Sequence, residues 1–280
     1  MVWSLKENEK ELKPLIFSSG KSQDDVVNEA LNAISKGNKI IFIHGVCGTG
    51  KSAIALNIAK HFKKSSIVVP IKNLQRQYEN DYTNKMHIIK DNGEKLKIKV
   101  ITGRNNHLCP FLKENDFEMN ERDGALDTFF RPSHEIIENN PNLSCDNRYL
   151  PCTIEIKEKN LKRIKEFLKQ NHNLNLKNFG NIKEVKRLSI ASICPYWSPI
   201  TPSSVDLNLK SNKRKYVGLD GKEFTFYQRK FGCSYYDQFN SYLDADVLIF
   251  NSQKYLIENI TRRTVAGVTM CDYGVLFKCD

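Results

Sequence analysis

The fold of this chain is decided by the stretch 39-KIIFIHGVCGTGKSAIALNIAKHF-62. The apolar run from Ile40 to Ile43 is typical of a buried strand, and the residues after Ser52 have the apolar spacing of a helix. Between them, Gly45-Val-Cys-Gly-Thr-Gly50-Lys51-Ser52 fits the pattern G-x-x-x-x-G-K-[ST] without a mismatch. Glycines in such a loop let backbone N–H groups converge on phosphate oxygens at the start of a helix. The stretch therefore predicts a nucleotide-binding loop between a strand and a helix.

Residues of this loop have predicted roles in binding ATP and Mg²⁺. Lys51 is expected to reach the β- and γ-phosphates, and the Ser52 hydroxyl is expected to ligate Mg²⁺. Gln23, just ahead of the loop, is a candidate for reading the adenine, with an ordinary exposed glutamine as the alternative. The other residues expected to hold the nucleotide are Gly45, Gly48, Thr49 and Gly50.

The flanking segments extend this unit into a parallel sheet. Upstream, 22-SQDDVVNEALNAISKGN-38 predicts a helix that is capped by Ser22 and ends at Gly37. Downstream, 66-SIVVPIKNLQRQYEND-81 predicts a buried strand that stops at Pro70 and is followed by a helix. A third strand is predicted in 96-LKIKVITG-103. Alternating strands and helices indicate an α/β fold with right-handed crossovers.

Composition and charge narrow the classes of protein and partner. The 280 residues are 40% hydrophobic, which is enough for one large or two modest domains. The net charge of +11 favours nucleic acid over membrane as a partner, although a lysine-rich solvated surface would give the same charge. The start of the chain lacks the apolar core of a signal peptide, and we expect a soluble, cytoplasmic protein. In that compartment, eight cysteines suggest metal binding, catalysis or burial more than disulfides.

Four further segments stand out: VVPIKNLQRQY, GRNNHLC, ICPYWSPI and FGCSYYDQFNSYLDADVLIFNS. Together with the loop GVCGTGKS they resemble the iron–sulfur superfamily 2 DNA helicases, the XPD and DinG group, and the DinG-like branch most. In that family a Gly-Arg-x-Asn-Tyr-x-Cys element opens a small cluster domain inserted into the first motor domain, and a Cys-x-Tyr-Tyr element closes it. This chain has Gly103 to Cys109, with His107 for the usual Tyr, and Cys233 to Tyr236. The resemblance runs from about Gln23 to Glu258.

The resemblance implies a domain plan and a partner. Residues 1–104 would begin an incomplete RecA-like P-loop motor domain, 105–236 would form the loop-rich inserted cluster domain, and 237–280 would return to the motor domain. The partner would be single-stranded or forked DNA, in a role such as DNA repair. Lys72 and Gln75 would lie along the single strand, and Arg104 would lie beside both cluster and DNA. The alternative for Arg104 is a helix-capping or carboxylate-paired arginine.

Five cysteines lie between the opening and closing elements: Cys109, Cys145, Cys152, Cys194 and Cys233. A 4Fe-4S cluster needs four thiolates on loops that can converge. Proline follows two of these cysteines and precedes a third. We expect the ligands to be Cys109, Cys152, Cys194 and Cys233, with Cys145 the spare, although the choice between Cys145 and Cys152 stays open. Zinc is the alternative metal, and buried, idle thiols are the other interpretation.

Two stretches combine cations with aromatic residues, as base-stacking surfaces do: 183-KEVKRL-188 leading to 195-PYWSPI-200, and 210-KSNKRKYVGLDGKEFTFYQRK-230. The second also predicts a β-hairpin, and core packing is the favoured role of its aromatic residues. A helix is predicted in 158-EKNLKRIKEFLKQN-171.

The end of the chain departs from the family pattern. An Asp-Glu box, which holds Mg²⁺ and orients the attacking water, is expected within 264-TVAGVTMCDYGVLFKCD-280. Asp272 stands at the metal-binding place, but Tyr273 replaces the glutamate. The resemblance thus implies the amino-terminal part of an ATP-dependent DNA helicase. Because the glutamate is missing, we expect poor hydrolysis of ATP and no unwinding by this chain alone. A second motor domain would be absent or supplied by another chain. The alternative is a remnant that binds nucleotide, metal cluster and nucleic acid without turnover.

Overall fold

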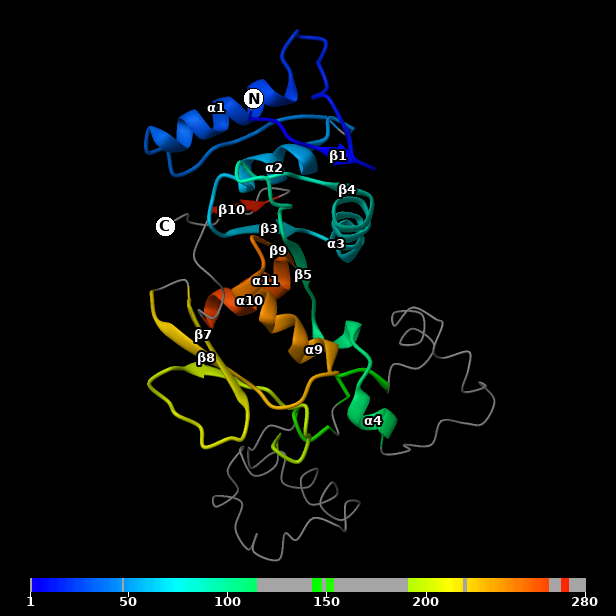
Figure 1. Ribbon diagram of the computed structural model, residues 1–280, viewed down its shortest axis with the longest axis vertical. Helices are drawn as coiled ribbons and strands as arrows, with labels where there is room; N and C mark the ends of the chain where they lie inside the picture. Colours follow the sequence, from blue (N-terminus) through cyan, green and yellow to red (C-terminus); the bar gives the residue numbers. More distant parts are fainter. Residues whose placement is uncertain are drawn as a thin grey trace, which may run out of the picture. The chain divides into compact units, whose positions relative to one another are not determined.

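The computed structural model describes residues 2–46, 48–114, 143–147, 150–153, 191–218, 221–261 and 268–271 (Figure 1). The chain divides into two compact units. The first unit comprises Met1–Thr102, Lys215–Phe224 and Phe239–Asp280, and the second comprises Gly103–Arg214 and Thr225–Gln238. The helix predicted at 158–171 and the pair Asp272 and Tyr273 lie outside the described residues.

A parallel sheet of four strands in the order β10-β3-β9-β5 forms the centre of the first unit. Its strands are β3 (Ser65–Val69), β5 (Ile98–Ile101), β9 (Val247–Asn251) and β10 (Val268–Cys271). Every residue of β3 is buried, which fits a strand covered on both faces. The predictions of strands at 66–69 and within 96–103, and of a parallel sheet, are therefore confirmed.

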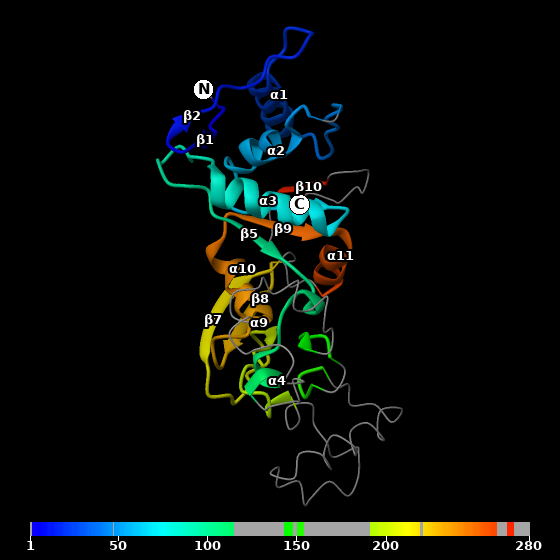
Figure 2. The same cartoon turned by 90° about the vertical axis from the view of Figure 1, so that its right-hand side faces the viewer.

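Helices cover both faces of this sheet (Figure 2). Ile67, Val247 and Ile249 pack in one core with Leu56 of α2 (Lys51–Ala59) and Val27 of α1 (Gln23–Ser35). Since successive strand residues point to opposite faces, the next residue Phe250 faces away from α2, and its ring contacts Tyr255 of α11 (Ser252–Ile260). This unit also contains α3 (Lys72–Glu79), the π-helix η1 (Asn80–Lys85) and α10 (Ser241–Asp244).

The start of α1 shows why this segment is helical. Ser22 and Asp25 form a reciprocal capping box, which satisfies two of the backbone donors left free at a helix start. Gly37, just beyond the helix, has a φ of 85°, a conformation that glycine adopts without strain. The predicted helix, its cap and its end are confirmed. A small sheet of β2 (Lys10–Glu11), β1 (Lys6–Glu7) and β4 (Met86–His87) completes the described part of the first unit.

The strand predicted from Ile40 to Ile43 is wrong. In the described part of the chain, residues 38–46 form no helix or strand, and Phe42 is 79% exposed. Ile40 and Val46 are also more than half exposed. The physical reason is that an apolar run becomes a strand only where a sheet edge pairs with it. Here β3 has its two neighbours, β10 and β9, without residues 40–43.

The second unit is built from short elements: η2 (Arg104–Asn106), α4 (Pro110–Glu114), β6 (Ile200–Pro202) and α9 (Ser234–Asp237). A sheet in the order β6-β8-β7 includes β7 (Asn212–Val217) and β8 (Glu223–Gln228), each of which crosses the boundary between the units. These two strands confirm the predicted hairpin. None of the described helices is long and apolar enough to cross a membrane.

Candidate functional site

In the predicted phosphate-binding loop, side chains donate hydrogen bonds to carbonyl groups of the loop itself. The Lys51 ammonium donates to the carbonyl oxygens of Gly45 at 3.2 Å and Val46 at 3.1 Å. The Thr49 hydroxyl donates to the same Val46 oxygen at 2.9 Å. Because a phosphate oxygen is a stronger, charged acceptor for an ammonium than a carbonyl, these bonds can be exchanged for bonds to a nucleotide. Ser52, half-buried in the first turn of α2, follows directly.

Glycine is required at the end of this loop for two reasons. Gly50 has a φ of 69°, in the left-handed region, and it caps α2. A Cβ atom at this position would lie 2.2 Å from the Gln23 amide nitrogen. The backbone of the loop therefore approaches Gln23 more closely than any other residue type permits.

Gln23 fastens the loop to the chain ahead of it. The side chain is 3% exposed, so the alternative of an exposed glutamine is wrong. Its amide nitrogen donates to the Thr49 carbonyl at 2.9 Å, and its amide oxygen accepts from the Leu15 backbone N–H at 2.9 Å. Both ends of the amide are thus engaged, and an adenine would have to displace one of these partners to be read.

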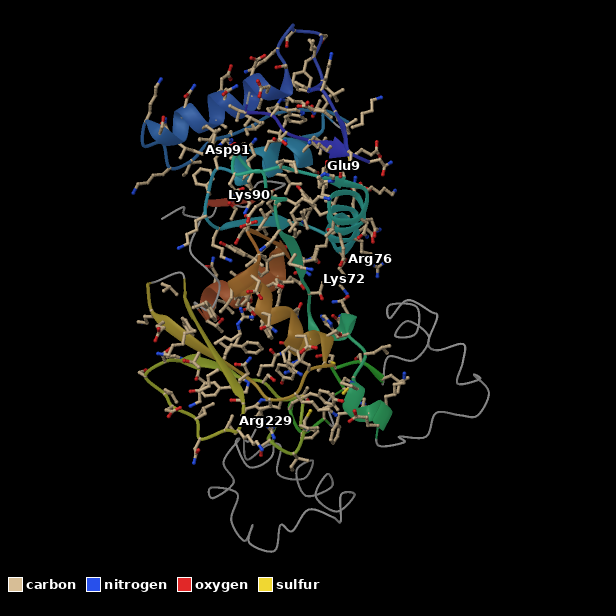
Figure 3. The ribbon with its side chains drawn as sticks, in the orientation of Figure 1. Glu9, Lys72, Arg76, Lys90, Asp91 and Arg229 are labelled. Atoms are coloured by element: carbon tan, nitrogen blue, oxygen red, sulfur yellow. The ribbon has the colours of Figure 1, made fainter. Side chains whose placement is uncertain are left out.

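Two residues expected along a nucleic-acid strand have different surroundings. Lys72 is exposed at the start of α3, on the same side as Arg76 (Figure 3). Gln75 is only 2% exposed, and its amide nitrogen donates to the carbonyl oxygens of Ile101 at 3.1 Å and Ile249 at 3.4 Å. It joins β5 to β9 inside the fold. The expectation that Gln75 contacts a nucleic-acid strand is therefore corrected, because a side chain this buried has no face that the nucleic acid can reach.

The five cysteines between the opening and closing elements are all buried, and all lie in the second unit. Backbone pairing brings two of them near: Cys109 N–H donates to Leu143 O at 2.9 Å, and Cys145 N–H donates to His107 O at 2.8 Å. The Cys145 sulfur then lies 3.8 Å from the Cys233 sulfur. Cys145 also shares a hydrogen bond with Cys109, and Cys152 shares one with Cys194. The loops thus converge on one cluster of thiols.

Side chains around the cluster hold its loops in place. Arg229, labelled in Figure 3, donates to the carbonyl oxygens of Cys194 at 2.9 Å and Ser192 at 3.0 Å. Cys233 precedes α9, where its carbonyl accepts from the backbone N–H groups of Tyr236 and Asp237. These contacts fix the backbone next to two thiols, so the convergence does not depend on the thiols alone.

Arg104 belongs to the thiol cluster. Its guanidinium donates to the Cys152 sulfur at 3.4 Å, to the Cys145 carbonyl at 3.3 Å and to the Tyr236 hydroxyl at 2.9 Å. It also lies over the Tyr235 ring, 4.3 Å from the centroid. Burial alone would lower the pKa of Arg104, but Tyr236, Tyr235 and Cys152 outweigh it and raise the pKa above its ordinary value. These contacts of Arg104 are to thiol, carbonyl and tyrosine groups of the described residues rather than to a helix end or a carboxylate.

Hydrogen bonds between the thiols of the cluster shift their pKa values in opposite directions. A hydrogen bond with Cys145 lowers the pKa of Cys109 and of Cys233, and raises the pKa of Cys145 itself. A hydrogen bond with Cys194, assisted by the Arg104 guanidinium, lowers the pKa of Cys152 to about 6. The same bond raises the pKa of Cys194. The pKa of three of the four expected ligands is thus lowered, in the direction of the thiolate form that binds metals.

The chemistry of this donor set fits a soft metal or an iron–sulfur cluster. Thiolates are the ligands of both, and five thiols exceed the four that either needs. Across the described residues, no three or more Cys, His, Asp or Glu side chains already have the spacing of a bound metal ion. The sulfurs instead lie in hydrogen-bonded contacts, so metal binding would require them to release protons and separate. The thiols fit the group in kind, and Cys145, the expected spare, lies in contact with Cys233.

In their described residues, the cation- and aromatic-rich stretches offer no stacking surface; residues 183–188 lie outside the described residues. Their aromatic residues Tyr196, Trp197, Tyr216, Phe226 and Tyr227 are all buried. This burial confirms core packing as their role. Two hairpin cations are paired, Lys213 with Asp206 and Lys215 with Glu223, both at 2.9 Å.

Comparison with known proteins bears on the first unit and on the start of the second. Residues 17–125 match the family model described as "Type III restriction enzyme, res subunit". The matched range contains the phosphate-binding loop, Gln23 and Lys72, but none of Cys145, Cys152, Cys194 or Cys233. No curated protein matches the chain significantly. Residues 17–125 are therefore similar to the RecA-like P-loop motor domain of superfamily 2 helicases.

Proposed function

We propose that this chain is the ATP- and DNA-binding part of a superfamily 2 helicase, with an iron–sulfur cluster in its second unit. The observation that carries the proposal is the loop from Gly45 to Ser52, which stands at the start of α2 and is fastened by Gln23. It lies inside the range that matches a helicase motor domain. The broad proposal, an ATP-dependent nucleic-acid motor domain, follows from the match; DNA as partner and the cluster go beyond it.

In this function the loop supplies charge and hydrogen-bond donors to the nucleotide. The Lys51 ammonium exchanges the carbonyls of Gly45 and Val46 for phosphate oxygens, and the Ser52 hydroxyl turns to Mg²⁺. The N-terminus of α2 adds its free backbone N–H groups. None of these groups activates water, so the described residues account for binding and for orientation of the phosphates.

The test of nucleotide binding is titration of MgATP against the protein and the variant Lys51→Ala. We expect the affinity to fall by about tenfold or more, because the charged contact with the phosphates is lost. Lys36→Ala, at the exposed C-terminal cap of α1, is the matched control and should bind ATP as the unchanged protein does. Equal ATP affinity in the two variants would exclude the loop as the nucleotide site.

We also propose that Cys109, Cys152, Cys194 and Cys233 hold a 4Fe-4S cluster, with Arg104 donating a hydrogen bond to the Cys152 sulfur. The convergence of buried thiols from four separate loops supports this. When bound, the cluster would cross-link these loops. Arg104 and Arg229 would keep the liganding loops in place. Zinc on the same thiols is the alternative.

The second candidate function is a module that binds nucleotide, metal and DNA without turnover. Tyr273 favours it, since it stands where a motor domain has the glutamate that orients water. The two candidates differ in single-turnover hydrolysis of ATP in the presence of single-stranded DNA. Release of phosphate would support the motor, whereas tight ATP binding with no release over hours would support the module.

A further inference from the structure

The second unit gathers five thiols where four ligate a cluster, and the surplus thiol is in contact with an expected ligand. We propose that Cys145 forms a disulfide with Cys233 when the site holds no metal, and so protects the emptied site from irreversible oxidation. The inference rests on the thiol site proposed above but not on the identity of the metal.

Geometry favours this pair. The two sulfurs are 3.8 Å apart, in direct contact, and both residues are buried, at 2% and 3% exposure. A disulfide has a sulfur–sulfur distance of about 2.05 Å, so the two atoms must close by roughly 1.8 Å, which side-chain rotation can supply. No atom has to be displaced from between them.

The other partner of Cys145 is less suited to a disulfide. Leu108 and Ser144 form an antiparallel bridge, with Cys109 N–H bonded to Leu143 and Cys145 N–H bonded to His107. Cys109 and Cys145 are therefore diagonal neighbours across this pairing, with Cα atoms expected about 7–8 Å apart. That is at or beyond the separation a disulfide can span without backbone movement, roughly 7 Å. Cys233 is on a separate segment, and its backbone is not tied to that of Cys145 by this pairing.

The remaining pair, Cys152 and Cys194, is held by other contacts. Arg104 donates to the Cys152 sulfur at 3.4 Å, and Arg229 fixes the backbone at Cys194. Rotation of the Cys152 sulfur toward a new bond would break its contact with the guanidinium. This pair is the competing outcome that an experiment must separate from the proposed one.

The step balances with hydrogen peroxide as the oxidant. Cys145 and Cys233 together give up two protons and two electrons, and a sulfur–sulfur bond forms. The oxygen–oxygen bond of the peroxide breaks, and two water molecules leave. A thiol reductant reverses this step, whereas a single thiol with no partner proceeds to sulfinic and sulfonic acids, which such a reductant does not restore.

The experiment uses the full chain, depleted of metal by a chelator under reducing conditions without oxygen. After removal of the reductant, one equivalent of hydrogen peroxide is added, free thiols are alkylated, and the peptides are mapped by mass spectrometry. Starting from eight cysteines, we expect two thiols to be lost and one bridge, Cys145–Cys233, to account for them. Cys152→Ser, the matched control, should form the same bridge.

Cys145→Ser tests the protective role. Each sulfinic acid consumes two equivalents of peroxide, so this variant and the unchanged protein are both treated with an excess. In the variant we expect sulfinic acid at Cys233 that dithiothreitol does not remove, and a lower uptake of iron on reconstitution than in the unchanged protein. Circular dichroism of each variant checks that it is folded. A bridge at Cys152–Cys194 or Cys109–Cys145, or no loss of thiols until the chain is denatured, would overturn the inference.

The metal content of the untreated protein distinguishes the proposed cluster from the proposed disulfide. A protein that carries no metal but forms the Cys145–Cys233 bridge would refute the cluster and leave the disulfide. A protein that carries iron but bridges other cysteines would refute the disulfide and leave the cluster.

Discussion

Two buried glutamines show how single side chains organise the first unit. Gln23 joins the phosphate-binding loop to the segment before α1, and Gln75 joins β5 to β9. A buried amide that satisfies two backbone groups stabilises the fold through the cost of leaving those groups unpaired. At this scale, two residues that the sequence marks as ligand contacts position the backbone through their side-chain amides.

Gln75→Ala should lower the free energy of unfolding by about 1–3 kcal/mol, because the carbonyls of Ile101 and Ile249 lose a buried donor. Gln77→Ala, on the exposed side of the same helix, should change it by less than about 0.5 kcal/mol. Urea denaturation measures both. If Gln75→Ala left stability unchanged and weakened binding of single-stranded DNA instead, the assignment to the interior would be wrong.

Gly50→Ala should weaken ATP binding, because the φ of 69° is strained for alanine and the Cβ, 2.2 Å from the Gln23 amide nitrogen, would push this amide off the Thr49 carbonyl. Gly37→Ala shares a positive φ, 85°, but nothing lies within 4 Å of its Cβ, so it should cost only about 1 kcal/mol of stability. ATP titration and thermal unfolding distinguish the two. Equal ATP affinity in both variants would contradict the close approach of Gln23.

The role of Gly50 follows from the loop pattern alone, but that of Gln75 does not. The carbonyls that Gln75 reaches lie 26 and 174 residues further along the chain, and no local pattern reports such partners. The same holds for Arg104, whose contact with Cys152 joins residues 48 positions apart. The sequence therefore indicates which residues are important more readily than it indicates which groups they contact.

Elements are predicted where their stabilising contacts are local or generic. The capping box of α1 lies within four residues, and the apolar runs of β3 and β5 find sheet neighbours. The run from Ile40 to Ile43 has the same composition, yet it pairs with no strand in the described part of the chain. Strand pairing depends on which edge of the sheet is free, and the amino-acid composition of a segment carries no information on that.

The exposed run gives a direct test. Phe42→Ala should change the free energy of unfolding of the nucleotide-free protein by less than about 0.5 kcal/mol, because the side chain is 79% exposed. Ile249→Ala, at the centre of the sheet, should cost about 2–5 kcal/mol. A loss for Phe42→Ala that approached the loss for Ile249→Ala would mean that residues 40–43 are buried as a strand.

At the scale of the whole molecule, the net charge of +11 and the exposed Lys72 bear on nucleic-acid binding. Lys72→Ala should weaken binding of single-stranded DNA and lower the slope of log affinity against log salt by about 0.7, the value for one phosphate contact. Lys95→Ala removes the same charge from an exposed position of the first unit and should leave the slope unchanged. Equal slopes in the two variants would contradict a specific contact at Lys72.

The convergence of the cysteines is the whole-molecule feature that the sequence predicted best. Elements at residues 103–109 and 233–236 bracket the segment, and the structure brings five thiols of that segment together. Which four would ligate a cluster depends on hydrogen bonds between loops, as with Cys145 and Cys233, and spacing along the chain does not report those.

The central claim joins a nucleotide-binding unit to a cluster-binding unit in one chain. Its most direct test is the iron and acid-labile sulfide content of protein purified without oxygen, beside Cys109→Ser as the ligand variant and Cys145→Ser as the matched control. We predict about four irons and four sulfides per chain, lost with Cys109→Ser and retained with Cys145→Ser. Zinc alone, or no metal in any of the three proteins, would contradict the cluster and leave a P-loop domain joined to a unit of buried thiols.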